Sequence, residues 1–177
     1  MGIYSKHILP KVINWTCKQN PSMKQRAKVV PLAYGNVLEV GIGSGLNLPF
    51  YEAGQLNHLS AIDPSIELWQ KNTIDTKSLG FGFDFIQGYA ENMPFENNTF
   101  DSVILTYTLC TIPDVNQAFV EILRVMKPNG TIIFYEHGKA PDKSVERWQN
   151  RANYLWKKIG GGCHLNRNIP CLIKDNG

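Results

Sequence analysis

The chain has 177 residues, of which 43% are hydrophobic and 19% charged, the composition of an ordinary globular protein with one sizeable core. Its 18 basic and 15 acidic residues give a net charge of +3 without a clustered basic stripe, so we expect no nucleic-acid partner. No apolar run approaches the roughly 20 residues of a membrane-spanning helix, and the N-terminus lacks the pattern of a signal peptide. We therefore expect a cytoplasmic protein with one domain over residues 1–177.

The four cysteines, Cys17, Cys110, Cys163 and Cys171, show no CxxC spacing. Such spacing is typical of structural zinc sites, so the sequence predicts no metal site. A chain of this size can rely on its core rather than on disulfides, and we expect reduced thiols. We expect Cys110 to pack as a small apolar residue.

The first 34 residues predict helices interrupted by Pro10, Pro21 and Pro31. Beyond them, short apolar runs alternate with helical segments. The predicted strands cover residues 36–40, 58–62, 83–86, 102–106 and 131–135. The predicted helices open at Leu46, run from Ser65 to about Lys77, follow Asp114, and span residues 142–159. This alternation indicates a three-layer αβα, Rossmann-like, doubly wound and mostly parallel sheet, whose ligands bind at the carboxyl edge of the strands.

The two helices of the second half carry the clearest signals. Asp114 is placed to cap the first, with Gln117 three residues on, and residues 128–130 (Pro-Asn-Gly) are predicted to end it and turn into the next strand. One buried face is predicted from Val115, Ala118, Phe119, Ile122, Leu123 and Met126. In the helix over 142–159 we interpret the apolar stripe as core, the alternative being a membrane-surface face flanked by basic residues. That stripe consists of Val145, Trp148, Ala152, Leu155, Trp156 and Ile159.

A glycine-rich loop, Gly41-Ile42-Gly43-Ser44-Gly45, follows the first predicted strand. Glycine allows backbone angles closed to other residues and lets a ligand approach the main chain. The spacing is GxGxG; Leu46 breaks the GxGxxG fingerprint of nicotinamide-dependent oxidoreductases, and the Lys-Ser/Thr pair of a Walker A loop is missing. Alone, the loop is equally consistent with a tight turn that binds nothing.

Asp63 closes the second predicted strand, 18 residues after Gly45. A carboxylate at this place can accept hydrogen bonds from both hydroxyls of a ribose. The alternative is an N-cap for the helix after Pro64. A third loop, residues 88–95, follows the third strand and can bring a main-chain amide to an adenine edge.

These residues together resemble the class I S-adenosylmethionine-dependent methyltransferases, in particular the type 11 domain. Leu38–Tyr51 (LEVGIGSGLNLPFY) is similar to motif I, and Ala61–Ser65 (AIDPS) is similar to motif II. The later motifs are matched by residues 88–95 with 100–103 and by Leu123–His137. More narrowly, the chain resembles bacterial relatives of the methyltransferase-like 7 group, on the evidence of residues 108–114, 135–138 and 161–167.

The resemblance implies S-adenosyl-L-methionine as cofactor and S-adenosyl-L-homocysteine as product. It places Gly41, Gly43 and Gly45 beneath the methionine moiety, Glu39 near the amino group, Asp63 at the ribose, Ala90 and Glu91 around the adenine, and Thr106 at the methionine end. Tyr89 stands where the family often has Asp. We expect an N-terminal helical segment (1–34), a cofactor-binding core (35–137) and a helical substrate-side segment (138–177), without the superfamily's C-terminal β-hairpin.

His137 follows the last predicted strand, and we expect it to act as a general base if the acceptor must lose a proton. The alternative is a histidine packed beside Glu136. Cys163 and His164 either line the acceptor pocket or form a turn, and Tyr107 either borders that pocket or packs as an ordinary aromatic residue. The acceptor is expected to be a small molecule, a lipid or a thiol, with peripheral membrane contact left open. The alternative function is a non-catalytic or truncated S-adenosylmethionine-binding domain.

Overall fold

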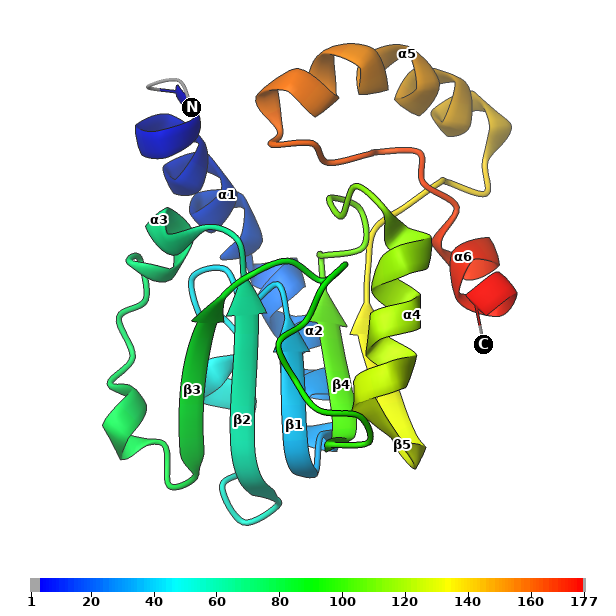
Figure 1. Cartoon of the computed structure of the whole chain (residues 1–177). Helices are drawn as coiled ribbons and strands as arrows, with labels where there is room; N and C mark the ends of the chain where they lie inside the picture. The colour runs from blue at the N-terminus through cyan, green and yellow to red at the C-terminus, as the bar shows by residue number, and fades with distance from the viewer. Residues whose placement is uncertain (1–3, 177) are drawn as a thin grey trace.

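The computed structural model describes residues 4–176. Five parallel strands form one sheet in the order β3-β2-β1-β4-β5. These are β1 (Gly35–Val40), β2 (Leu56–Asp63), β3 (Gly82–Gln87), β4 (Phe100–Thr106) and β5 (Met126–Tyr135). All five arrowheads lie at one edge of the sheet in Figure 1. The predicted fold class is confirmed, and the order reverses direction between β1 and β4, the point at which such sheets bind ligands.

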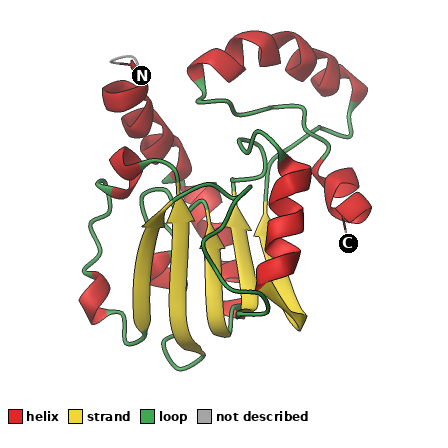
Figure 2. Ribbon diagram, viewed as in Figure 1, coloured by secondary structure: helices red, strands yellow, loops and turns green. Residues whose placement is uncertain are grey.

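Helices cover both faces of the sheet (Figure 2), and the strands therefore bury side chains on both sides. Leu38 and Val103 belong to the hydrophobic cluster that includes Phe119 of α4 (Val115–Val125). Their neighbours Val37 and Ile104 belong to the second cluster on the opposite face. This double burial is why β1 and β4 are nearly continuous apolar runs in the sequence.

The N-terminal helices are α1 (Leu9–Cys17) and α2 (Asn20–Val29). Pro10 and Pro21 lie in their first turns, where a missing N–H costs nothing, so these two prolines begin helices rather than interrupt them. In α4, Asp114 accepts a hydrogen bond from the Gln117 amide at 3.1 Å, which confirms the predicted cap. The predicted end of this helix is wrong: it stops at Val125, and residues 128–130 lie inside β5.

Two predicted helices are much shorter than expected. The segment after Leu46 forms only the 3₁₀ turn Leu48–Phe50, because Pro49 restricts the chain and the buried Asn47 side chain is held by other residues. The helix expected to reach Lys77 is reduced to α3 (Ile66–Trp69) and a 3₁₀ turn, Thr76–Ser78. Asn72 ends it by bonding both backbone groups of Ile74, an alternative to helical bonding.

The C-terminal segment contains α5 (Lys143–Ile159), capped by Asp142, and α6 (Ile169–Asn176). In Figure 1, α5 arches beyond the carboxyl edge of the sheet, away from the helices that cover its faces. Its apolar stripe is solvent-exposed, with Trp148 and Leu155 both 64% exposed, so the interpretation of this stripe as core is wrong. Across residues 4–176 no helix is both long enough and apolar enough to cross a membrane.

Candidate cofactor site

The glycine loop leaves β1 through three residues with positive φ, Gly41 (76°), Gly43 (55°) and Gly45 (74°). A Cβ atom on Gly41 would lie 2.4 Å from the Thr108 Oγ1 atom, so the loop is packed tightly against the end of β4. A Cβ atom on Gly43 would meet nothing within 4 Å. The loop therefore presents a bare stretch of main chain at the carboxyl edge, which a ligand can approach closely.

Asp63 is hydrogen-bonded to the glycine loop. Its Oδ2 atom accepts from the Gly43 amide and its Oδ1 atom from the Ser65 amide, both at 2.8 Å. Ser65, and not Asp63, caps α3 by accepting from the Leu68 amide, so the alternative reading of Asp63 as the N-cap is wrong. Burial raises the pKa of Asp63, opposed by these two backbone bonds. Each carboxylate oxygen keeps acceptor capacity for a further hydroxyl.

Glu39 and Thr106 lie in one buried polar network that reaches α2. The Glu39 carboxylate accepts from Asn47 Nδ2 at 2.9 Å and from the Tyr51 hydroxyl at 2.8 Å. Arg26 Nη1 donates to Asn47 Oδ1 at 2.7 Å and to Thr106 Oγ1 at 2.6 Å. Burial raises the pKa of Glu39 to about 7, against the lowering effects of its hydrogen bonds and of Arg26. Arg26 as a whole is only 5% exposed, and its Nε atom has no hydrogen-bond partner within the described residues.

Sequence reasoning missed three members of this network: Arg26, Asn47 and Tyr51. Arg26 stands among other basic residues of a short helix and carries no local signal. Asn47 and Tyr51 lie within the stretch that resembles motif I, and only their burial beside Glu39 shows that they are part of the site.

The loop after β3 lies beside Asp63, because the Gly88 amide donates to the Asp63 carbonyl at 3.2 Å. Ala90 is buried and Tyr89 is 60% exposed. The Glu91 carboxylate accepts from the Asp114 amide at 3.2 Å, so this side chain ties the loop to the start of α4. The loop thus lies next to Asp63 with Ala90 buried, and binding of adenine there stays a prediction.

A second group of polar side chains surrounds the end of β5. His137 Nε2 is 3.3 Å from Cys163 Sγ, in the loop after α5. The hydrogen bond to Cys163 raises the pKa of His137, while hydrogen bonds from Cys110 and His137 lower the pKa of Cys163 to about 4. Burial raises the pKa of Glu136 to about 7, although the Thr108 and Leu109 amides both donate to its Oε1 atom. Cys110 is buried as predicted, but it also faces this group.

Tyr107 joins the two groups. The Arg26 guanidinium lies over its ring at 5.4 Å from the centroid, and the His137 ring centroid is 6.1 Å from the Tyr107 ring centroid. Its backbone has a φ of 58°, and its hydroxyl donates to Ser22 Oγ at 3.0 Å. The polar network beneath the glycine loop and the groups around His137 therefore form one continuous region at the carboxyl edge.

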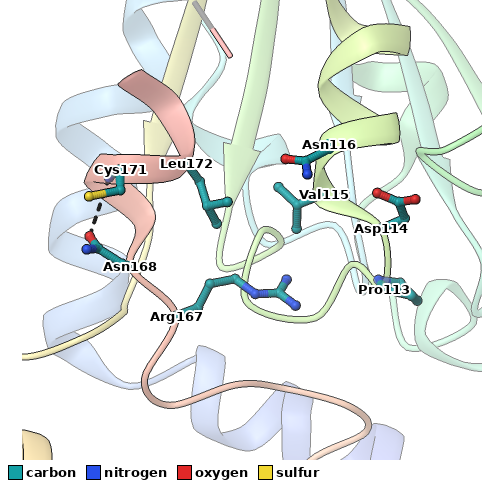
Figure 3. A pocket seen from close by; sticks show the side chains of 8 residues that line it. All are labelled: Pro113, Asp114, Val115, Asn116, Arg167, Asn168, Cys171 and Leu172. Carbon is teal, nitrogen blue, oxygen red and sulfur yellow. Dashed lines mark hydrogen bonds between the residues drawn. The ribbon is translucent and has the colours of Figure 1, made fainter. Parts of the chain in front are cut away.

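A separate pocket lies between the start of α4 and α6 (Figure 3). Its lining contains no residue predicted to bind the cofactor. The Arg167 guanidinium there is already engaged, since it donates to the carbonyls of Leu109 and Ile112. The pocket is lined by Pro113, Asp114, Val115, Asn116, Arg167, Asn168, Cys171 and Leu172.

A family profile described as "Methyltransferase domain" matches residues 38–134, and the chain belongs to this family, whose cofactor is S-adenosylmethionine. The rat thiol S-methyltransferase TMT1B (Rattus norvegicus) is 34% identical over 74% of this chain and 54% of its own length. The ubiquinone/menaquinone biosynthesis C-methyltransferase UbiE of Rickettsia prowazekii is 31% identical over 64% of this chain and 48% of its own length.

Among solved structures, a SAM-dependent methyltransferase of Thermotoga maritima, titled a possible histamine N-methyltransferase, superposes with a TM-score of 0.65. It is 18% identical, and the match covers 98% of this chain and 79% of that one, so it supports the fold alone. The chain spans about half the length of the curated thiol methyltransferases that it matches. The resemblance to the methyltransferase-like 7 group is consistent with these relatives.

Proposed function

We propose that this protein transfers a methyl group from S-adenosylmethionine to the sulfur of a small thiol. The proposal rests on the continuity of the site. At one end, the Gly43 amide of the glycine loop donates to Asp63, and the Arg26 guanidinium lies over the Tyr107 ring. At the other end, the His137 ring lies near Tyr107, and His137 is within hydrogen-bond distance of Cys163. A cofactor cradle and a group suited to handling an acceptor proton thus share one edge of the sheet.

The residues present fit the cofactor. Asp63 would accept from the ribose hydroxyls, and the bare main chain at Gly43 would pass beneath the methionine part. Within residues 4–176, Arg26 is a buried cation whose hydrogen bonds go to Asn47 and Thr106 and not to a carboxylate, which suits the carboxylate of the methionine moiety. Glu39 suits the amino group of that moiety. Bound in this way, S-adenosylmethionine supplies an already activated methyl group on a sulfonium. The protein's task is then to position the two reactants and to exclude water.

A thiol acceptor is favoured over other classes by two observations. First, two of the matched relatives, TMT1B of Rattus norvegicus and TMT1A of Homo sapiens, are named thiol S-methyltransferases. Second, a thiol has a pKa of about 8.5, so one nearby group is enough to deprotonate it at neutral pH. An alcohol would need much stronger activation. His137, half-buried at the end of β5, is the group that we place next to the acceptor sulfur.

The test is turnover with defined acceptors. Purified protein is incubated with S-adenosylmethionine and a small alkyl thiol, an amine or a phospholipid in parallel, and S-adenosylhomocysteine and methylated product are quantified. We expect methylated thiol alone to accumulate. Methylation of only the amine or the lipid would refute the thiol assignment. Calorimetric binding of S-adenosylhomocysteine without turnover of any acceptor would instead support the non-catalytic alternative.

A further inference from the structure

A compact cluster of sulfur and imidazole groups lies at the acceptor side of the site. Cys110, His137 and Cys163 each offer one ligand atom, and these three atoms all lie within 4.8 Å of one another. We propose that they bind a divalent transition metal of the zinc class, leaving a fourth position for the thiolate of an incoming acceptor. The metal site itself is independent of the proposed function; only the nature of the fourth ligand rests on it.

The donor set and its spacing suit this ion. Two thiolates and one imidazole are ligands preferred by zinc, and a Cys₂His set with an open position is typical of catalytic rather than structural sites. With Zn–S near 2.3 Å and Zn–N near 2.0 Å, tetrahedral geometry separates sulfur and nitrogen by about 3.5 Å. The distance of 3.3 Å between Cys163 Sγ and His137 Nε2 is close to this value.

The three ligands come from different segments that are fastened to one another. Cys110 follows β4, His137 follows β5, and Cys163 lies in the turn after α5. The His164 amide donates to the Cys110 carbonyl at 2.8 Å, which joins the first segment to the third. Glu136 joins the first to the second, because its Oε1 atom accepts from two amides of the loop after β4. The cluster is therefore held in place before any ion arrives, which reduces the cost of binding.

A second observation also favours a cation at this place. The Oε2 atom of Glu136 is buried and has no hydrogen-bond partner within the described residues. An unpartnered carboxylate oxygen in such surroundings is unfavourable, and a divalent ion at the neighbouring His137 would offset it. Sequence spacing did not reveal this site, because the ligands are far apart in the chain and only the fold brings them together.

The arrangement assigns a specific role to the open position. Among residues 4–176, no fourth ligand-type side chain joins the cluster. A thiol binding there does so as thiolate: its S–H bond breaks, a metal–sulfur bond forms, and the proton leaves to water. His137 then acts as a ligand, and the metal instead of an imidazole base stabilises the ionised acceptor.

The test uses the full chain, freed of metal with a chelator and kept reduced with a phosphine. Cobalt(II) is added, and thiolate-to-cobalt charge-transfer and visible ligand-field bands are recorded. We expect one cobalt per chain, displacement by zinc, and a change in the charge-transfer band when 2-mercaptoethanol is added. Cys110→Ser and Cys163→Ser should each weaken cobalt binding at least tenfold. Cys171→Ser, an exposed cysteine away from the cluster, should leave binding unchanged.

The outcomes separate the two proposals. Absence of cobalt bands, or bands that persist in the Cys110→Ser/Cys163→Ser double variant, would overturn the metal site. Thiol methylation by chelated protein would overturn it as a functional site while leaving the proposed function intact. If 2-mercaptoethanol does not change the spectrum of the bound cobalt, the proposal that the fourth coordination position is open to a thiolate is wrong. Retained S-adenosylhomocysteine binding in the serine variants shows that they are folded.

Discussion

Gly41 and Gly43 allow the stability and binding roles of the glycine loop to be separated by one matched pair of substitutions. Both residues have positive φ, so alanine at either position adds the backbone cost of the left-handed conformation, about 1–2 kcal/mol. At Gly41 the added Cβ atom also meets Thr108 Oγ1 at 2.4 Å. Displacing Thr108 breaks its hydrogen bond to the Val40 carbonyl, which costs about 1 kcal/mol more.

Gly41→Ala should therefore have the larger effect on stability, and Gly43→Ala should have a marked effect on cofactor binding. Gly41→Ala should lower the free energy of unfolding by about 2–3 kcal/mol, equivalent to roughly 5–10 °C in Tm for a chain of this size. Gly43→Ala should lower it by only about 1–2 kcal/mol. It should nevertheless weaken S-adenosylhomocysteine binding more than tenfold, because its methyl group occupies the space left for the ligand. Thermal unfolding and titration calorimetry measure both quantities. If Gly43→Ala binds like the parent, the loop does not pass beneath the cofactor.

Three other perturbations test the rest of the structure. Asp63→Ala should abolish measurable S-adenosylhomocysteine binding; unchanged calorimetric affinity would contradict the ribose assignment. Glu39 has a folded pKa raised from 4.5 to about 7, so the stability it contributes is full below about pH 4.5 and falls as the pH rises through 7. This loss is about 3 kcal/mol, and Glu39→Gln should show a shallower decline of Tm over that range. Glu136, Asp63 and His137, whose pKa values are also raised, contribute to the remaining slope, and Cys163, whose pKa is lowered, opposes it. Trp148→Ser should change Tm far less than Phe119→Ala, which removes a buried ring at a cost of about 3–5 kcal/mol; equal losses in unfolding experiments would mean that the face of α5 is covered in solution.

The central strands of the sheet were predictable because they satisfy one simple condition. Residues of β1 and β4 are buried on both faces, so an apolar run bounded by polar residues identifies them without knowledge of their partners. The N-cap at Asp114 was also predictable, since its carboxylate and the Gln117 amide lie only three residues apart in the sequence. The prediction of a long helix after Ser65 was wrong, and the reason is again local. Asn72 can satisfy the backbone of Ile74 with its own side chain, and propensity alone does not show that this bond wins.

The candidate site was predictable only where it follows strand ends. Gly41 and Asp63 each occupy a fixed place after a strand of a parallel sheet, and the fold brings such places together by rule. Arg26 reaches the site from a helix on one face of the sheet, and Cys163 reaches it from a turn beyond α5. No spacing rule connects those positions to β4 or β5. Their contribution depends on tertiary packing, and so the cluster with Cys110 and His137 appears only in three dimensions.

The exposed face of α5 shows what a periodic pattern does and does not specify. Apolar residues at helical spacing define a face, and the same spacing arises whether that face meets a core, a lipid surface or another chain segment. In α5, the one buried side chain is polar: Asn153 accepts from the Leu165 amide at 2.9 Å and so fixes the turn that carries Cys163 and His164. The helix is thus attached to the site through its polar side, and its apolar side is turned outward. Packing of the site, and not burial of the stripe, sets the orientation of α5.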